Sequence, residues 1–107
     1  MERIMVSAYR PYKGKEEVFK SLFFSQVAIL REEGFLSDRD PWFMRAKDGT
    51  YLCFLEWKSW GVADKPGTNP KVQKLWMQFE KICSFEKPAS IPEFQQMFSL
   101  LEALKPE

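Results

Sequence analysis

The sequence predicts an α+β protein, and three observations support that prediction. Strand-like and helix-like segments alternate along its 107 residues, a length typical of one domain spanning residues 1–107. Hydrophobic residues make up 45% of the chain and aromatic residues 16%, which favours a folded core over disorder. The seven prolines all fall outside the interiors of the predicted helices, where a proline would break a helix.

The first elements are a strand and a helix. Residues 3–10 ("RIMVSAYR") have the composition of a strand, and Pro11 ends it because proline cannot donate to a β-ladder. Apolar residues then recur at helical spacing from Lys15 to about Glu33. Gly34 stands where a glycine commonly follows a helix C-terminus.

A hairpin and a loop occupy the middle of the chain. Strands are predicted at residues 42–46 and 50–58, and Asp48-Gly49 between them is a strong signal for a type I′ turn. The stretch at residues 60–70 is rich in glycine and proline and predicts a loop.

The last part of the chain predicts a helix, a short strand and a further helix. Asn69 and Pro70 have the residue types of an N-cap and a first helical position, and apolar residues at helical spacing follow them. A short strand is predicted at residues 84–88. Ser90 and Glu93 form the pattern of a capping box, which predicts a C-terminal helix over "PEFQQMFSLLEAL".

The predicted order β-α-β-β-α-β is the ferredoxin-like arrangement, an antiparallel sheet with two helices on one face, here with an extra C-terminal helix. The strand "TYLCFLEWKSW" has apolar residues on both faces, unlike a strand with one face in water. The two helices cover one face. The other face has no cover within the chain unless the last helix folds across it. A second copy of the sheet would cover it, so the sequence predicts a homodimer in which two sheets form an α/β barrel.

Several classes of function are excluded or disfavoured by composition. The chain has no histidine, which excludes Ser-His-Asp and Cys-His catalysis within it. Cys53 and Cys83 have no metal-ligand spacing and are expected to be buried thiols, so no metal and no cofactor are predicted. The net charge of +1, without a basic patch, gives no support for nucleic-acid binding.

A cytoplasmic location is the expectation. The start "MERIMVSAYR" lacks the apolar stretch of a signal peptide. No segment approaches the roughly 18 apolar residues of a membrane span, so no membrane association is predicted.

Three segments carry a resemblance to a known family: "VSAYRPYKGKEEVFKSLF", "YLCFLEWKS" and "NPKVQKLWMQFEKI". They are similar to the antibiotic biosynthesis monooxygenase domain family of the dimeric α/β-barrel superfamily, and the similarity extends from about Arg3 to Leu104. The resemblance implies a pocket between sheet and helices in each subunit. The family includes cofactor-free oxygenases, heme-degrading enzymes and members with no assigned reaction.

The resemblance also disfavours heme degradation. The asparagine and histidine that the heme-degrading members use fall at Ser7 and Trp76 of this chain. The quinone-forming members hold a phenolic substrate with Asn, Trp and Arg. Asn69 and Trp76 match two of these by residue type.

Candidate site residues follow from the residue chemistry and the resemblance. Glu56 and Trp76 are the catalytic candidates, as a general base in an apolar setting and as an aromatic wall. The alternatives are that Glu56 pairs with a basic residue such as Arg45, and that Trp76 belongs to the core. Residues expected to bind substrate are Ser7, Tyr9, Trp42, Phe54, Asn69 and Phe79. Asn69 could equally be only an N-cap, and Ser7 and Tyr9 could face the partner subunit.

Two functions remain open from the sequence. The first is a cofactor-independent monooxygenase acting on a small aromatic or polyketide-like molecule, which it would position in a water-poor cavity. The second is a non-catalytic dimer that binds a ligand or another protein.

Overall fold

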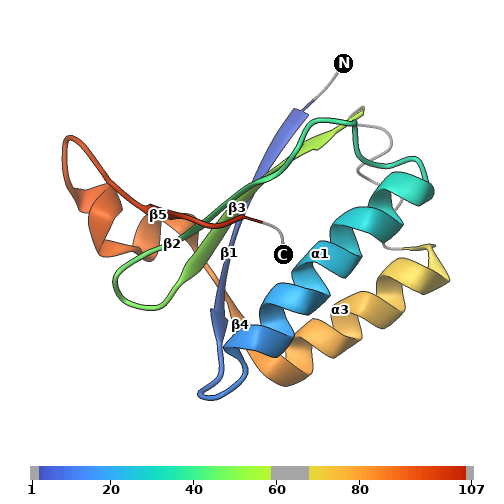
Figure 1. Cartoon of the computed structure of the whole chain (residues 1–107), viewed down its shortest axis with the longest axis horizontal. Helices are drawn as coiled ribbons and strands as arrows, with labels where there is room; N and C mark the ends of the chain where they lie inside the picture. Colours follow the sequence, from blue (N-terminus) through green and yellow to red (C-terminus); the bar gives the residue numbers. More distant parts are fainter. Residues whose placement is uncertain (1–2, 59–67, 106–107) are drawn as a thin grey trace.

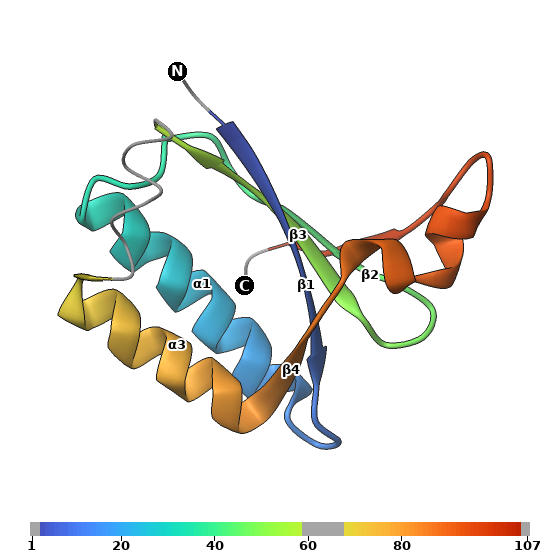
Figure 2. The ribbon, with the colours of Figure 1, turned by 180° about the vertical axis from the view of Figure 1, so that it is seen from behind.

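The described residues fold into two layers, an antiparallel sheet and a pair of α-helices that both lie on one of its faces (Figures 1 and 2). The computed structural model describes residues 3–58 and 68–105. Their elements, in chain order, are β1 (Arg3–Pro11), α1 (Glu16–Glu32), β2 (Trp42–Arg45), β3 (Tyr51–Trp57), α3 (Pro70–Ile82), β4 (Cys83–Glu86), the 3-10 helices η2 (Pro88–Ser90) and η3 (Pro92–Gln95), and β5 (Glu102–Ala103).

In the described part of the chain the sheet has five strands in the order β4-β1-β3-β2-β5. Four of them reproduce the predicted ferredoxin-like order, so the α+β fold is confirmed. The loop predicted for residues 60–70 lies, up to residue 67, outside the described residues. No helix within residues 3–58 and 68–105 has both the length and the hydropathy needed to cross a bilayer.

The core between the layers is mainly aromatic. Phe19 and Phe23 of α1 are fully buried, and the ring of Phe23 stacks on that of Phe43 with centroids 4.3 Å apart. Tyr51 of β3 packs against both Phe19 and Phe43. Tight packing of these rings fixes α1 against the sheet.

Strand register sets which side chains face the helices. In the β1–β3 pair, Ser7 lies opposite Cys53 and Tyr9 opposite Tyr51, and these residues share the face that the helices cover. β4 runs beside Ala8–Pro11, the last part of β1, and the chain then turns away into η2. The space between the earlier part of β1 and α3 is therefore not filled by β4.

The β2–β3 hairpin forms as predicted, but its turn is not type I′. The Gly49 N–H donates to the Ala46 carbonyl at 3.1 Å, and the Ala46 N–H donates to the Thr50 carbonyl at 2.8 Å. A type I′ turn needs two central residues with positive φ, and in this turn only Gly49 has one, at 92°. The connection is a type I turn followed by a glycine bulge, which the same Asp-Gly pair also permits.

The predicted C-terminal helix is wrong. The segment forms η2, η3 and an extended arm that ends in β5. The Ser90 hydroxyl donates to the Lys87 carbonyl, and the Glu93 carboxylate accepts from the Lys47 N–H at 2.8 Å, so neither completes a capping box. Pairing of Glu102 and Ala103 with β2 supplies backbone hydrogen bonds that a helix at this place could not make.

This arm covers only part of the outer face of the sheet. Ile91 is fully buried and packs with Ala8, Ala46 and Leu52, a small second core at the hairpin end of that face. Apolar side chains elsewhere on the same face stay exposed, among them Trp42 at 63%. The arm therefore replaces part of the cover that the sequence assigned to a second subunit.

Replacement of Ile91 by alanine should lower the free energy of unfolding by about 2–5 kcal/mol, because it removes a fully buried side chain from the second core. Gln96→Ala, an exposed position in the same segment, is the matched control and should change stability by less than about 0.5 kcal/mol. Urea unfolding measures both. Equal stabilities for the two variants would contradict the packing of the arm on the sheet.

Candidate functional site

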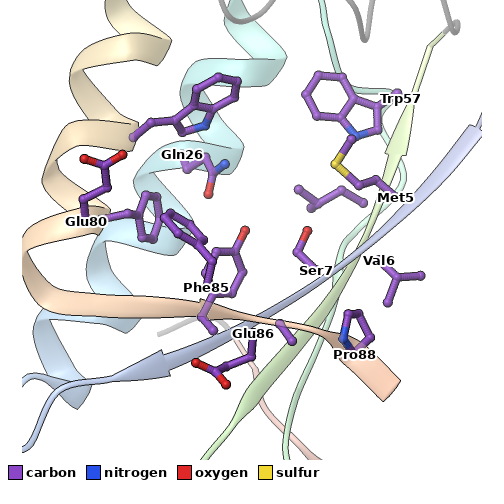
Figure 3. A pocket seen from close by; sticks show the side chains of 14 residues that line it. Met5, Val6, Ser7, Gln26, Trp57, Glu80, Phe85, Glu86 and Pro88 are labelled. Carbon is purple, nitrogen blue, oxygen red and sulfur yellow. The ribbon is translucent and has the colours of Figure 1, made fainter. Parts of the chain in front are cut away.

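A cavity of about 380 Å³ lies between the sheet and α3, beside β1 and β4 (Figure 3). Its volume falls within the range of small-molecule sites. Side chains of α1, α3, β1, β3 and β4 line it, so every layer of the fold contributes to its wall.

Aromatic rings form most of this wall. Tyr9 lies at its base, with its ring stacked on Phe79 at 5.6 Å and tilted against Phe85 at 5.6 Å. Trp57 and Trp76 add two indoles from β3 and α3. Trp76 is 37% exposed and Phe85 is 56% exposed, so these two residues form the rim while Tyr9 and Phe79 are buried. The arrangement suits a flat apolar molecule.

Polar atoms are few and well enclosed. Gln26 projects from α1 into the cavity and Ser7 projects from β1 (Figure 3). Two buried side-chain atoms of the lining, Gln26 Oε1 and Trp57 Nε1, have no hydrogen-bond partner within residues 3–58 and 68–105. Most buried polar groups in folded proteins are paired, so these two atoms are notable.

The deeper wall carries no charge at neutral pH. Burial raises the pKa of the Tyr9 phenol well above its usual value, and the neighbouring Cys53 thiol adds to the effect. Burial also raises the pKa of Cys53 to about 12. Both groups therefore stay protonated. The charged side chains among the described lining residues are two carboxylates, Glu80 of α3 and Glu86 of β4.

Four of the predicted site residues meet in this cavity: Ser7, Tyr9, Trp76 and Phe79. They come from β1 and α3, which are distant in sequence and adjacent across the cavity. A pocket between sheet and helices is also what the family resemblance implied.

Three further candidates lie on the opposite face of the sheet. Trp42 pairs with Phe54 across β2 and β3, and Glu56 follows two residues after Phe54 on the same face. Glu56 accepts a hydrogen bond from the Ser37 hydroxyl at 2.7 Å and pairs with Arg39 at 3.0 Å. The structure thus gives this carboxylate a cationic partner on the far side of the sheet from the cavity.

The suggested partner of Glu56, Arg45, instead pairs with Glu102 of β5. Asn69 caps α3: its side-chain oxygen accepts from the N–H groups of Lys71 and Val72, and its Nδ2 donates to Glu33 at 2.9 Å. Asn69 is not among the residues that line the cavity.

The sequence reasoning missed Gln26, Trp57 and Phe85 as site residues. Gln26 carried a usable signal, because it falls on the buried stripe of α1 formed by Phe19, Phe23, Val27 and Leu30. A polar residue on such a stripe either finds a buried partner or faces a cavity. Trp57 and Phe85 gave no comparable signal, since core aromatics have the same pattern.

Among the described residues, no group of three or more His, Cys, Asp or Glu side chains is placed to hold a metal ion. Cys53 and Cys83 are buried free thiols. Burial raises the pKa of Cys83 to about 11, as it does for Cys53.

The fold and the cavity together define a class: small ferredoxin-like α+β proteins with an aromatic cavity between sheet and helices. The structure is similar to that of Rv0793 from Mycobacterium tuberculosis, with a TM-score of 0.62, 14% sequence identity, and coverage of 82% of this chain and 95% of the other. At this identity the similarity shows the fold alone. No family model matches the chain, and no curated protein matches it in sequence.

Proposed function

We propose that this protein binds a small, flat aromatic molecule in the cavity between α3 and the sheet. The observation that carries the proposal is the composition of the wall, which has aromatic side chains from four elements: Tyr9, Trp57, Trp76, Phe79 and Phe85. Each of these rings offers an apolar face or edge to a planar ligand.

Binding of such a molecule is favoured by the buried part of the wall. Tyr9 and Phe79 are held by contacts with Phe19, whose ring lies 5.3 Å from Tyr9 and 5.9 Å from Phe79. Because these rings are fixed in the core, little side-chain freedom is lost when a ligand packs against them. The rim residues Trp76 and Phe85 are partly exposed, so a ligand in the cavity would cover part of their rings.

Cofactor-independent oxygenation is the second candidate function, and the position of Glu80 favours it. This glutamate lines the cavity from α3, one helical turn from Trp76. A carboxylate at the rim of an aromatic site could take a proton from a phenolic substrate, after which the substrate anion would react with oxygen itself. The resemblance to the antibiotic biosynthesis monooxygenase domain family supports this reading. Because Glu80 lines the cavity and Glu56 lies on the other face of the sheet, Glu80 is the better candidate for the general base.

A homodimer is part of the proposal. The outer face of the sheet carries a cross-strand row of Val6, Phe54 and Trp42, with Ile4 beside it. Ile4 is 54% exposed, Val6 41% and Trp42 63% in the single chain. A contiguous apolar surface of this kind is typical of an interface. Stacking of a second sheet on it would bury the row under two-fold symmetry.

Trp76→Ala should weaken the binding of 2-naphthol by about tenfold, because the ligand loses an aromatic contact at the rim. Met77→Ala, next to it on α3 and outside the cavity lining, is the control and should bind as the parent protein does. Equilibrium dialysis gives both affinities. The ligand-binding proposal fails if the parent protein does not bind naphthol or related bicyclic aromatics.

Trp42→Glu should shift a dimer towards monomer, because it places a charge at the β2 end of the apolar row, inside the proposed interface. Val18→Glu, an exposed apolar position of α1 at the surface away from the sheet, is the matched control. Sedimentation at micromolar concentration is the measurement. A parent protein that sediments as a folded monomer would exclude the dimer.

Oxygen uptake with anthrone or dihydroxynaphthalene substrates tests the oxygenase candidate. Glu80→Gln should reduce the uptake rate by about a hundredfold, since loss of a general base has an effect of this order. Glu56→Gln is the comparison variant and should leave the uptake rate nearly unchanged. A larger loss of uptake in Glu56→Gln than in Glu80→Gln would contradict Glu80 as the general base. Tight ligand binding without uptake across the panel would leave ligand binding as the function.

A further inference from the structure

Two polar atoms in the cavity wall are buried without a partner. The side chain of Gln26 is 5% exposed and that of Trp57 is 4% exposed. Gln26 Oε1 and Trp57 Nε1 make no hydrogen bond within the described residues. Figure 3 shows that both side chains face the cavity, Gln26 from α1 and Trp57 from β3.

The two atoms have complementary chemistry. An amide oxygen only accepts hydrogen bonds, and an indole N–H only donates them. An enclosed polar atom without a partner destabilises a protein, because it has lost its hydrogen bond to water. A leucine or methionine at Gln26 would fill the same part of the apolar stripe of α1 without that cost. A ligand that pairs with Gln26 gives a physical reason for an amide there.

The charge of the cavity limits the ligand further. Glu80 brings a carboxylate to the rim from α3, whereas Glu86 pairs with Ala8 and so lies on the outer-face side of β4, and the described lining residues include no lysine or arginine. A carboxylate or phosphate on the ligand would therefore meet like charge and no cationic partner in a site of low polarity.

We propose that the cavity selects a neutral, flat aromatic molecule with two separate polar positions. One is a hydrogen-bond donor that pairs with Gln26 Oε1, and the other is an acceptor that pairs with the Trp57 N–H. This inference rests on the proposed binding function and adds the polar pattern and the charge of the ligand to it.

Four bicyclic probes of similar size separate these requirements. Naphthalene has neither polar group, quinoline has an acceptor, 6-hydroxyquinoline has a donor on one ring and an acceptor in the other, and 2-naphthoate carries a negative charge. At mildly alkaline pH the first three are neutral. We expect 6-hydroxyquinoline to bind about tenfold more tightly than quinoline, and quinoline about tenfold more tightly than naphthalene. We expect 2-naphthoate to bind most weakly.

Two variants assign each preference to one residue. Gln26→Leu should bring the affinity ratio of 6-hydroxyquinoline to quinoline close to one and leave naphthalene binding intact. Trp57→Phe removes the indole N–H, so it should bring the affinity ratio of quinoline to naphthalene close to one. Gln78→Leu, an exposed glutamine of α3 outside the cavity lining, is the matched control and should leave both ratios unchanged. Equilibrium dialysis provides all of these affinities.

The stability of the unliganded variant is an independent readout. Gln26→Leu should unfold at the same or a higher temperature than the parent protein, because it removes an unpaired buried oxygen. A large fall in its melting temperature would show that the amide is already paired within the protein and would contradict the inference. Gln26→Met serves for the affinity ratios if the leucine variant does not fold.

The outcomes separate this inference from the function on which it rests. If none of the neutral probes binds, the ligand-binding proposal itself is wrong. If they bind with equal affinity and both variants leave the ratios unchanged, binding stands and the polar selection is wrong. Tight binding of 2-naphthoate would overturn the proposed preference for a neutral ligand.

Discussion

The constraint on which this structure depends is a sheet with two apolar faces, of which the α-helices within the described residues cover one. Helices α1 and α3 bury the side of β3 that carries Tyr51, Cys53 and Leu55. On the other side, Ile91 from the C-terminal arm covers Leu52 at the hairpin end. The cross-strand row at Val6, Phe54 and Trp42 is left for another surface to cover. The arm thus covers the hairpin end of the outer face, and the proposed partner subunit would cover the rest.

The cavity has its origin in the same layered arrangement. β4 pairs with the end of β1 and leaves after Glu86, while α3 continues past the earlier part of β1. The space between them is walled by rings rather than filled by a strand. Since Tyr9 contacts Phe19, Phe79 and Phe85 together, the base of the cavity is also part of the main core. Folding of the main core therefore also shapes the base of this cavity.

Much of the fold could be predicted because its signals are local. Proline at residue 11, the Asn69 N-cap and the glycine at residue 34 mark element ends by backbone chemistry, and the structure has ends at these places. The C-terminal helix could not be predicted correctly, because Ser90 and Glu93 satisfy a local capping pattern. Ser90 instead donates to the carbonyl of Lys87 within the arm, and the partner of Glu93, the Lys47 N–H, depends on how the arm meets the hairpin.

The candidate site could likewise be predicted only where local patterns identify its residues. Ser7, Tyr9, Trp76 and Phe79 could be grouped from strand alternation and helix spacing, which place each on an inward face. Glu56 could not be placed, since alternation fixes its face but not the Arg39 and Ser37 groups that hold it. Gln26 could have been singled out as a polar residue on the buried stripe of α1, but that pattern does not distinguish a buried partner from a cavity. Its meaning comes only from the cavity beside it.

The unequal exposure of the cavity wall has a consequence for how this protein can change. Tyr9 and Phe79 also hold the two layers together, so substitutions there alter stability and recognition at once. Trp76 and Phe85 stand at the rim and are much more exposed than Tyr9 and Phe79, so substitutions there remove less buried packing. Under the proposed binding function, a lineage of such proteins can acquire new ligand preferences by exchanging rim side chains, while the inner rings are kept because the fold needs them.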